Sequence, residues 1–387
     1  MAEIIQRGKT WAYKVYLGTD PLTQKRIFDR KGGFKTQREA KAAARQVEIQ
    51  KENGTYLKES DIPFEQFAQD WLKTYSRSGV KVSSVRAREK EMKHFINVWG
   101  PYPISKITKK MYQDRIIDLS EQYSHNYMDG IHACGRMIFR QAVELGLMKV
   151  NPTENFKLPK KQQTVEDLEK TEEEIIFLEK EELALFLKLA QTDGLEMDHL
   201  IFMVLSYTGL RIGELLALKW TDFNEKQGTI RVIKTLYNPN NHIEKFQLLT
   251  PKTKGSVRTI KIVENIVNML KKHRIKQNEI KLKNHLIYQD NGFIFAREDG
   301  HPQLRKVVDT RLKRLLKKAG IVKNITPHSF RHTHTSLLIE AGVGIKEIQQ
   351  RLGHTDINTT MNIYAHMTSN MEEKASQKFE KLMEDLL

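Results

Sequence analysis

The sequence predicts a multidomain protein, mainly helical with small β-sheets: a three-stranded sheet with one helix, then a helical domain, then a mixed α+β domain. Its 387 residues suffice for roughly two to four domains of ordinary size. Alternating apolar patterns and patterns of helical period occupy separate parts of the chain. Residues 158–175 carry few apolar side chains and end in an acidic run, which is typical of a linker.

Composition narrows the class of protein. The chain has 64 Lys and Arg against 48 Asp and Glu, a net charge of +16, which favours a polyanionic partner, nucleic acid before a membrane surface. The single cysteine, Cys134, excludes an intramolecular disulfide and a cysteine-rich zinc module. No apolar run approaches the ~18–20 residues that span a bilayer, and no apolar core follows the N-terminus as in a secretory signal. We therefore expect a cytoplasmic protein without a membrane partner.

The first domain is expected over residues 1–58. Alternation predicts a strand over 11–17 and a turn, then a returning strand over 25–30 and a break at 31–34. A helix then begins at the capping residue Thr36 and ends near residue 54.

Charge is dense in this first domain. The first 60 residues carry 13 Lys and Arg against seven Asp and Glu, a surplus of six. Two interpretations stay open, a solvated mini-domain and a DNA-binding head that presses its sheet against a groove with cations on phosphates. The candidate contacts in the head are Lys14, Lys25, Arg26 and Arg30.

The second domain, over 61–157, is expected to be all-helical. Aromatic residues recur at helical spacing from Phe64, Ser83 and Ser84 are expected to cap a second helix, and Thr108 begins a third. A fourth helix is expected over 123–147. The exposed cations of this second domain could bind phosphates or simply face solvent. The candidate contacts are Lys81, Arg86, Arg88 and Lys93.

The third domain is expected over 176–387 and combines helices with short strands. The predicted helices span 179–191, 196–207, 211–218, 264–282, 304–319, 327–341, 345–352, 358–366 and 370–386, and the predicted strands span 229–236, 245–251 and 256–262. The last helix carries apolar residues on one face, which either pack within the chain or dock onto a neighbour.

The motifs of several common enzyme chemistries are absent from the sequence. The sequence has no G-x-G-x-x-G after a strand, no G-x-x-x-x-G-K-[ST] and no G-x-S-x-G. His328 and His332 have the spacing of metal ligands, but no Glu follows the first His, and Arg331 between them disfavours a cation. We therefore expect neither a metal nor a cofactor.

Three separated fragments of the third domain form a different pattern. In the first, T-G-L-R-I-G-E-L, Arg211 opens a helix where the dipole disfavours its charge, although Glu214 could simply pair with it at i, i+3. In the second, T-P-H-S-F-R-H, His328 and Arg331 share a face at a helix N-terminus, where phosphates bind well but surface polar residues are also common. In the third, L-G-H followed by T-x-x-x-Y-x-H, Tyr364 lies ten residues beyond His354.

Together, the order R … H-x-x-R … G-H … Y resembles the tyrosine recombinase, or phage integrase, family over about 175–370. The segment P-K-T-K-G-S-V-R-T-I, residues 251–260, resembles the family's β-hairpin lysine segment. The two upstream domains are similar in kind to the arm-binding head and the helical core-binding domain of integrases from phages and integrative conjugative elements. The resemblance implies a site-specific recombinase that integrates and excises a mobile element.

The resemblance also implies roles for the residues. Arg211 and Arg331 would hold the phosphate oxygens, and Tyr364 would attack to form a 3′-phosphotyrosyl link. Because a phenol has an ordinary pKa of about 10, it needs a proton acceptor, for which His328 is the favoured residue. His354 would donate a hydrogen bond to the phosphate.

The remaining roles concern the leaving group and the supporting residues. Lys252 would be the general acid for the 5′-oxygen, with Lys254 as its rival. Glu214 would orient active-site groups, and His366 is either supporting or structural. No ATP or metal would be required, because the covalent link keeps the energy of the broken bond.

The partners implied are duplex DNA at core and arm attachment sites, further copies of the chain in a tetramer on DNA, an excisionase and a host DNA-bending protein. Two alternatives remain, a type IB topoisomerase-like relaxase and a non-catalytic sequence-specific DNA-binding protein. A prokaryotic protein acting at the nucleoid is expected.

Overall fold

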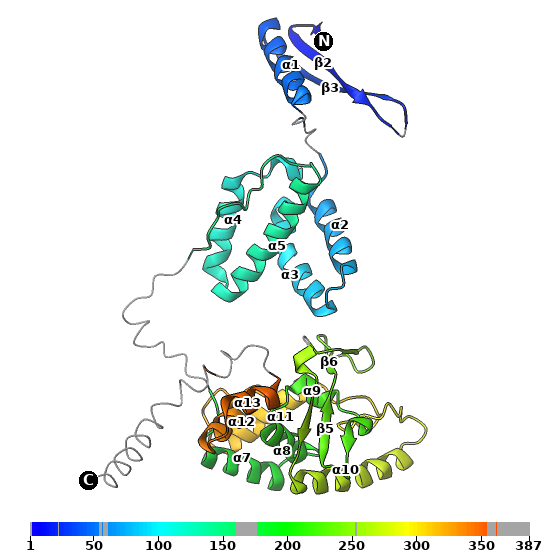
Figure 1. Ribbon diagram of the computed structural model, residues 1–387, viewed down its shortest axis with the longest axis vertical. Helices are drawn as coiled ribbons and strands as arrows, with labels where there is room; N and C mark the ends of the chain where they lie inside the picture. The colour runs from blue at the N-terminus through cyan, green and yellow to red at the C-terminus, as the bar shows by residue number, and fades with distance from the viewer. Residues whose placement is uncertain are drawn as a thin grey trace, which may run out of the picture. The chain divides into compact units, whose positions relative to one another are not determined.

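The computed structural model describes most of the chain (Figure 1). The described residues are 2–21, 23–53, 56, 61–159, 176–251, 254–353 and 361. By its contacts the chain divides into two units, Met1–Gln163 and Thr164–Leu387. The first unit contains the N-terminal sheet and the helical part, and the second contains the third part.

The N-terminal part is an antiparallel sheet of three strands in the order β1-β2-β3, covered by one helix. The bounds are β1 (Glu3–Arg7), β2 (Thr10–Thr19), β3 (Arg26–Phe34) and α1 (Gln37–Glu52). Tyr13 and Val15 project from β2 and pack against Ala44 and Val47 of α1. The Thr36 hydroxyl accepts a hydrogen bond from the Glu39 amide, which confirms the expected cap.

Two details of the head differ from the sequence prediction. The expected break at 31–34 is wrong, because β3 continues through Phe34 and Tyr13 pairs with Lys31 in the ladder. The register shift between Trp11 and Tyr13 of β2 accommodates Gly32 and Gly33 of β3 without ending that strand. The edge strand β1 was not located by its pattern, since five residues alternate too briefly to stand out.

The second part is helical, with helices packed around an aromatic core (Figure 1). The bounds are α2 (Phe64–Arg77), α3 (Val82–Trp99), the 3₁₀ turn η1 (Ile104–Lys106), α4 (Lys109–Gln122) and α5 (His125–Glu144). The rings of Phe64, Phe95, Trp99, Tyr112 and Phe139 meet one another at centroid separations of 5.6–6.4 Å. Such burial of several aromatic faces supplies most of the driving force for this fold.

The helix starts are partly as expected. Thr108 caps α4 by accepting from the Met111 amide, as predicted. Ser83 and Ser84 do not cap α3, which begins at Val82 after Lys81, so both serines lie inside the first turn. The fourth helix is shorter at each end than 123–147, because Ser124 precedes its first turn and the chain leaves the helix after Glu144.

The third part combines helices with two small antiparallel sheets, of order β4-β5-β8 and β6-β7. The helices and 3₁₀ turns are α7 (Lys180–Thr192), α8 (Asp198–Thr208), α9 (Ile212–Leu216), η2 (Trp220–Asp222), η3 (Lys254–Ser256), α10 (Glu264–Lys283), α11 (Arg305–Lys318), α12 (Ser329–Glu340) and α13 (Ile345–Leu352). The strands are β4 (Phe223–Asn224), β5 (Thr229–Val232), β6 (Thr235–Tyr237), β7 (Gln247–Leu249) and β8 (Arg258–Lys261). The single strand predicted over 229–236 is wrong, since β5 and β6 belong to different sheets.

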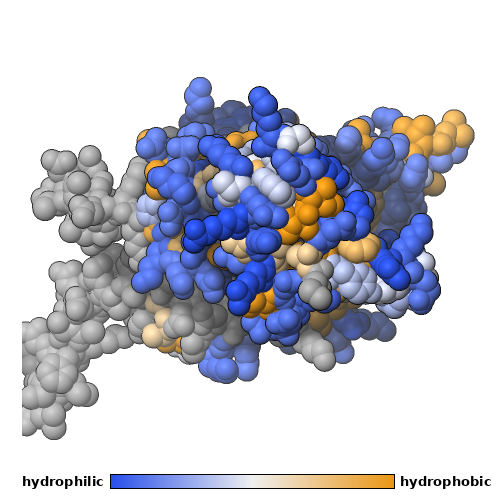
Figure 2. All heavy atoms as spheres, turned by 90° about the horizontal axis from the view of Figure 1, so that it is seen from above, coloured by the Kyte–Doolittle hydropathy of each residue, from blue (hydrophilic) through white to orange (hydrophobic). Residues whose placement is uncertain are grey.

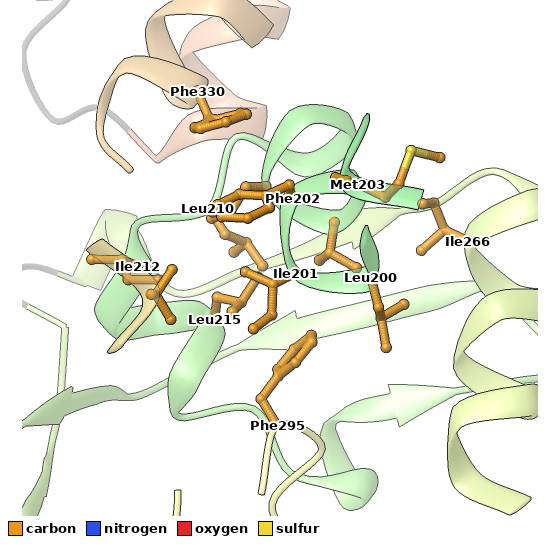
Figure 3. Close-up of a cluster of buried hydrophobic side chains, with 14 of the residues drawn as sticks. Leu200, Ile201, Phe202, Met203, Leu210, Ile212, Leu215, Ile266, Phe295 and Phe330 are labelled. Atoms are coloured by element: carbon orange, nitrogen blue, oxygen red, sulfur yellow. The ribbon is translucent and has the colours of Figure 1, made fainter. Parts of the chain in front are cut away.

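The core of this part surrounds α8, most of whose side chains are buried. Figure 3 shows Phe202 of α8 below Phe330 of α12, and the two rings stack with centroids 5.4 Å apart. Phe186 of α7 meets both rings. The segments that carry Arg211 and Arg331 therefore adjoin this buried core.

Hydrophilic residues dominate the face shown in Figure 2, where hydrophobic ones gather only in small separate groups. Within the described ranges, none of the helices is both long and apolar enough to cross a membrane.

Candidate active site

Arg211 stands at the junction of two helices. Gly209 ends α8 in the left-handed conformation at φ 61°, and a Cβ there would lie 2.6 Å from Leu352 and 2.8 Å from His334, so only glycine fits. Arg211 then precedes the first residue of α9. Its backbone N–H donates to Glu214 Oε2 at 3.1 Å and its Nη1 donates to Oε1 at 2.9 Å. The i, i+3 pair is thus present, and 40% of the Arg211 side chain still faces solvent.

Arg331, on the first turn of α12, is almost completely buried, with 1% exposed. Its Nη1 donates to the Gly209 carbonyl at 2.8 Å and its Nη2 donates to the Leu352 carbonyl at 2.7 Å. Burial, followed by the charge of Arg211, lowers the pKa of Arg331 to about 9, so it remains cationic at neutral pH. Arg331 therefore ties together the segments leading to Arg211 and to His354.

His328 immediately precedes α12, which starts at Ser329, slightly later than the expected 327. Burial, followed by the charges of His332, Arg331 and Arg211, lowers the pKa of His328 to about 4. The rings of His328 and His332 meet edge to face with centroids 4.8 Å apart. At neutral pH His328 is consequently an uncharged imidazole that can accept a proton.

Arg211 and His328 open onto one cleft of about 790 Å³. Tyr237 of β6 and Arg305 of α11 also line it. Cations thus outnumber anions around the cleft, an arrangement that attracts an anionic ligand. Among the residues that the structure describes, no three His, Cys, Asp or Glu side chains gather as metal ligands do.

Arg258 is a site residue to which the sequence reasoning gave no role. It is 9% exposed and donates from Nη2 to Glu214 Oε2 at 2.8 Å and from Nη1 to Oε1 at 3.3 Å. Burial alone would raise the pKa of the Glu214 carboxyl, but Arg258 and Arg211 together hold it below its ordinary range. The available signal was its place in β8, where Arg258 and Ile260 occupy the two buried positions of an alternating strand.

His334 and Arg351 extend the same network. His334 Nδ1 bonds the Ser206 carbonyl at 2.8 Å, and its Nε2 accepts from Arg351 Nε at 3.1 Å. Burial, followed by the charge of Arg351, lowers the pKa of His334 to about 4, which keeps the ring neutral for this pair of bonds. Arg351 also donates to the Tyr207 carbonyl at 3.0 Å, so α13 is anchored to the end of α8.

Several sequence-predicted residues lie outside the described ones: Lys252, His354, Tyr364 and His366, with the helices expected over 358–366 and 370–386. Lys254 begins the 3₁₀ turn η3. Of the expected catalytic set, the structure therefore brings together Arg211, His328 and Arg331, with Glu214 between Arg211 and Arg258.

Three protein-family models match the chain. The model of the phage integrase family matches residues 176–371, about half of the chain. An arm DNA-binding domain model matches residues 4–51, and the N-terminal SAM-like domain of phage integrases matches residues 63–120. The integrase of Staphylococcus phage L54a is 32% identical over 338 residues, covering 83% of this chain and 94% of that protein. The chain belongs to the phage integrase family.

Further integrases resemble the chain at lower sequence identity. The ICEBs1 integrase of Bacillus subtilis is 29% identical over 292 residues, which is 75% of each chain. The solved structure of the Tn1549 transposon integrase in complex with transposon right end DNA covers 82% of this chain and 99% of its own, with a TM-score of 0.62 and 23% identity. A lambda integrase dimer bound to a COC′ core site covers 93% of each chain, with a TM-score of 0.55 and 16% identity. These two structures show a shared fold.

The chain is therefore an integrase, a site-specific DNA recombinase of the mobile-element type and an enzyme of DNA strand exchange. The topoisomerase-like and non-catalytic alternatives are not favoured.

The integrase head carries its candidate DNA contacts on β2, β3 and the segment between them. Lys25, Arg26 and Arg30 are exposed. Lys14 pairs with Glu3 at 3.2 Å and its Nζ lies 4.6 Å from the centre of the Phe28 ring, on which Arg30 also rests. The exposed cations stay candidate contacts, and Lys14 is partly engaged within the head.

In the helical part of the integrase, Arg88 differs from its expected surface position. Its Nη1 donates to Glu91 at 2.5 Å and to the Gly130 carbonyl at 2.8 Å, which fastens α3 to α5. Arg88 is thus an internal link, because both bonds of its Nη1 lie inside the bundle. Lys93 is exposed beside Glu89, and Lys81 and Arg86 are half-buried near the start of α3.

Proposed function

We propose that this integrase cleaves and rejoins duplex DNA by transesterification, with Tyr364 as the nucleophile. The observation that supports the proposal is that one partly exposed arginine and one neutral histidine line the same cleft, with a buried arginine close to both. Arg211 presents its guanidinium to solvent, Arg331 adds a cation behind it, and His328 lines the same cleft. A phosphodiester fits these charges, because negative charge grows on its non-bridging oxygens during attack.

The proposed cleavage step balances as follows. The Tyr364 hydroxyl oxygen forms a bond to phosphorus, the bond from phosphorus to the 5′-oxygen breaks, and the DNA 3′ end stays on the enzyme. The Tyr364 proton passes to His328, whose ring is neutral at pH 7 and whose pKa the negative charge of the bound phosphate would raise during the step. Lys252, or its rival Lys254, gives a proton to the leaving 5′-oxygen, and His354 donates a hydrogen bond to the phosphate.

Rejoining reverses these steps with the 5′-hydroxyl of a partner strand. The phosphotyrosyl bond conserves the energy of the broken phosphodiester, so neither ATP nor a metal ion is required. The two arginines supply the charge that a metal would otherwise provide, and preorganised charge of this kind is usually the largest catalytic contribution.

The proposed partner is duplex DNA at core and arm attachment sites, with integration and excision of a mobile element as the outcome. Relatives have been solved with transposon end DNA and, for lambda integrase, as a tetramer bound to a Holliday junction. We extend the tetramer to this chain and add an excisionase and a host DNA-bending protein as accessory partners. Such a reaction would take place in the bacterial cytoplasm, at the nucleoid.

The test is Tyr364→Phe on a nicked duplex carrying the element's own end sequence. Wild-type protein should form a covalent DNA adduct, seen as a band of reduced mobility in a denaturing gel. Tyr364→Phe should form none while still shifting the intact duplex in a native gel, because only the nucleophilic oxygen is removed. Both reactions are repeated in EDTA, where cleavage should persist.

Adducts that survive in Tyr364→Phe would refute the assignment of the nucleophile. Strict dependence of cleavage on a divalent metal would instead refute the metal-free mechanism. Tyr237→Phe, which changes a cleft tyrosine not assigned to the chemistry, is the matched control.

A further inference from the structure

Arg258 lies on the hairpin lysine segment and contacts two further segments, one that carries Arg211 and one that precedes His354. We propose that Arg258 is a positioning residue for DNA cleavage, its single buried guanidinium fixing the Arg211 segment, the hairpin lysine segment and the segment before His354 relative to one another. This inference rests on the proposed roles of those residues.

The first contact acts on Arg211 through Glu214. Arg258 holds both carboxylate oxygens of Glu214, and the same two oxygens accept from the Arg211 backbone N–H and Nη1. The carboxylate is 5% exposed, so its orientation depends on these bonds and not on water. Glu214 therefore transmits the position of Arg258 to the arginine that faces the cleft.

The second and third contacts are to backbone carbonyls. Arg258 Nη1 donates to the Ser256 carbonyl at 3.2 Å, two residues after Lys254. Arg258 Nε donates to the Arg351 carbonyl at 2.8 Å, three residues before His354. One planar group thus joins the end of the hairpin segment to the end of α13.

The end of α13 is also shaped around this side chain. Gly353 is left-handed at φ 67°, and a Cβ on it would lie 3.2 Å from Arg258 Cδ and 3.3 Å from the Ser256 Cα. Gly353 therefore ends α13 in close contact with Arg258. A glycine is required here both by the backbone conformation and by the neighbour.

Only arginine offers donors in this arrangement. Its guanidinium spreads five N–H groups over a rigid plane, whereas a lysine presents three from a single nitrogen. A lysine could keep the charge near Glu214 but could not bond Glu214, the Ser256 carbonyl and the Arg351 carbonyl at the same time. Since a misplacement of ~1 Å can slow a reaction about 100-fold, loss of these bonds should appear in the rate of cleavage.

The experiment compares Arg258→Met, Arg258→Lys and the control Arg311→Met in the full-length chain. Arg311 also makes a largely buried ion pair in the same domain, with Asp198 at 3.1 Å, but has no bond to the site. Three quantities are measured for each protein: the single-turnover rate of strand release from a saturating nicked duplex of the element's end sequence, the Kd for that duplex, and the melting temperature.

Arg258→Met should slow strand release by about 100-fold, with the Kd changed by less than about threefold. Arg258→Lys should remain at least about tenfold slow, because it restores the charge without the three bonds. Arg311→Met should melt earlier and cleave at the wild-type rate once rates are compared at equal folded fractions. If Arg258→Met does not fold, Arg258→Lys carries the test on its own.

Two results would overturn the proposal. One is a rate for the Arg258 variants equal to that of Arg311→Met at equal folded fraction, since the role would then be structural only. The other is full rescue by lysine, which would leave charge alone as the explanation. Strand release is scored whichever residue attacks, so failure of the Tyr364 assignment and failure of the Arg258 proposal give different results.

Discussion

Glu91 in the helical part and Glu214 in the third part are both buried glutamates, with 6% and 4% exposed, and both bind arginine. The pKa values of the two carboxyls nevertheless shift in opposite directions from the ordinary value. Burial raises the pKa of the Glu91 carboxyl, and the charge and hydrogen bond of Arg88 only partly offset this. For Glu214, burial is outweighed by Arg258 and Arg211, and its pKa is lowered.

The difference shows what a second cation does for a buried carboxylate. With one arginine, the desolvation of Glu91 exceeds the attraction, and the Arg88 that it contacts joins α3 to α5 through the Gly130 carbonyl. With two arginines and a backbone N–H, Glu214 remains a firm anion that can orient Arg211. The helical part has an ion pair within one helix, whereas the third part has a cluster that holds Arg211, the proposed phosphate-binding residue, in position.

The largest expected effect is that of Glu214→Gln. This change leaves Arg258 buried without an anion, and breaking a buried pair in this way typically costs about 3–5 kcal/mol of the free energy of unfolding. Cleavage should also slow by roughly 100-fold, because Arg211 loses its orientation. Domain-resolved amide hydrogen exchange measures the first effect, and single-turnover strand release measures the second.

A Glu214→Gln protein that keeps wild-type protection and wild-type cleavage would break the comparison. It would mean that the neutral amide holds the two arginines as well as the carboxylate does, and that charge is irrelevant to the cluster.

The next effect, Glu91→Gln, should be smaller. A carboxyl whose pKa is already raised loses little when it is replaced by a neutral isostere, so we expect a change of about 1 kcal/mol or less in the stability of the bundle. Strand release should match the wild type. Protection of α3 and α5 against hydrogen exchange reports the stability, and a loss as large as that of Glu214→Gln would contradict the proposed distinction.

The smallest expected effect is on the pH dependence of stability, which should have opposite signs in the two domains. Glu214 has a folded pKa below the ordinary 4.5, so its contribution to stability is present above pH 4.5 and is lost as the pH falls through the lowered value. Glu91 has a folded pKa above 4.5, so the bundle gains stability as the pH falls from that raised value to 4.5. Exchange protection of each wild-type domain, measured against its own Glu→Gln variant from pH 7 to 3, should therefore diverge. Parallel curves would show that the second cation does not decide the sign.

Local patterns located most of the elements. Helical spacing and the caps at Thr36 and Thr108 place α1 and α4 to within a few residues, because an Ncap hydroxyl acts on an amide only three residues away. The same local rule failed at Ser83 and Ser84. There the chain enters α3 at Val82, and the serines inside the first turn contribute no cap. The strand predicted over 229–236 failed because sheet membership depends on distant partners.

The residues of the site likewise include some that local patterns predicted and one that they did not. Arg211, Glu214, His328 and Arg331 were predictable because each stands in a short motif, and the pair formed by Arg211 and Glu214 is itself a helical neighbour contact. Arg258 was not, since its bonds reach Glu214 across 44 residues and Arg351 across 93.

By itself the sequence determined the fold class, the family and the chemical types at the cleft, because these depend on residue identity and short spacing. Only the tertiary structure decided which arginine is buried, which carboxylate stays charged and which guanidinium joins the motifs. Burial and net charge at a point are sums over every segment that packs there, and no local pattern contains that sum.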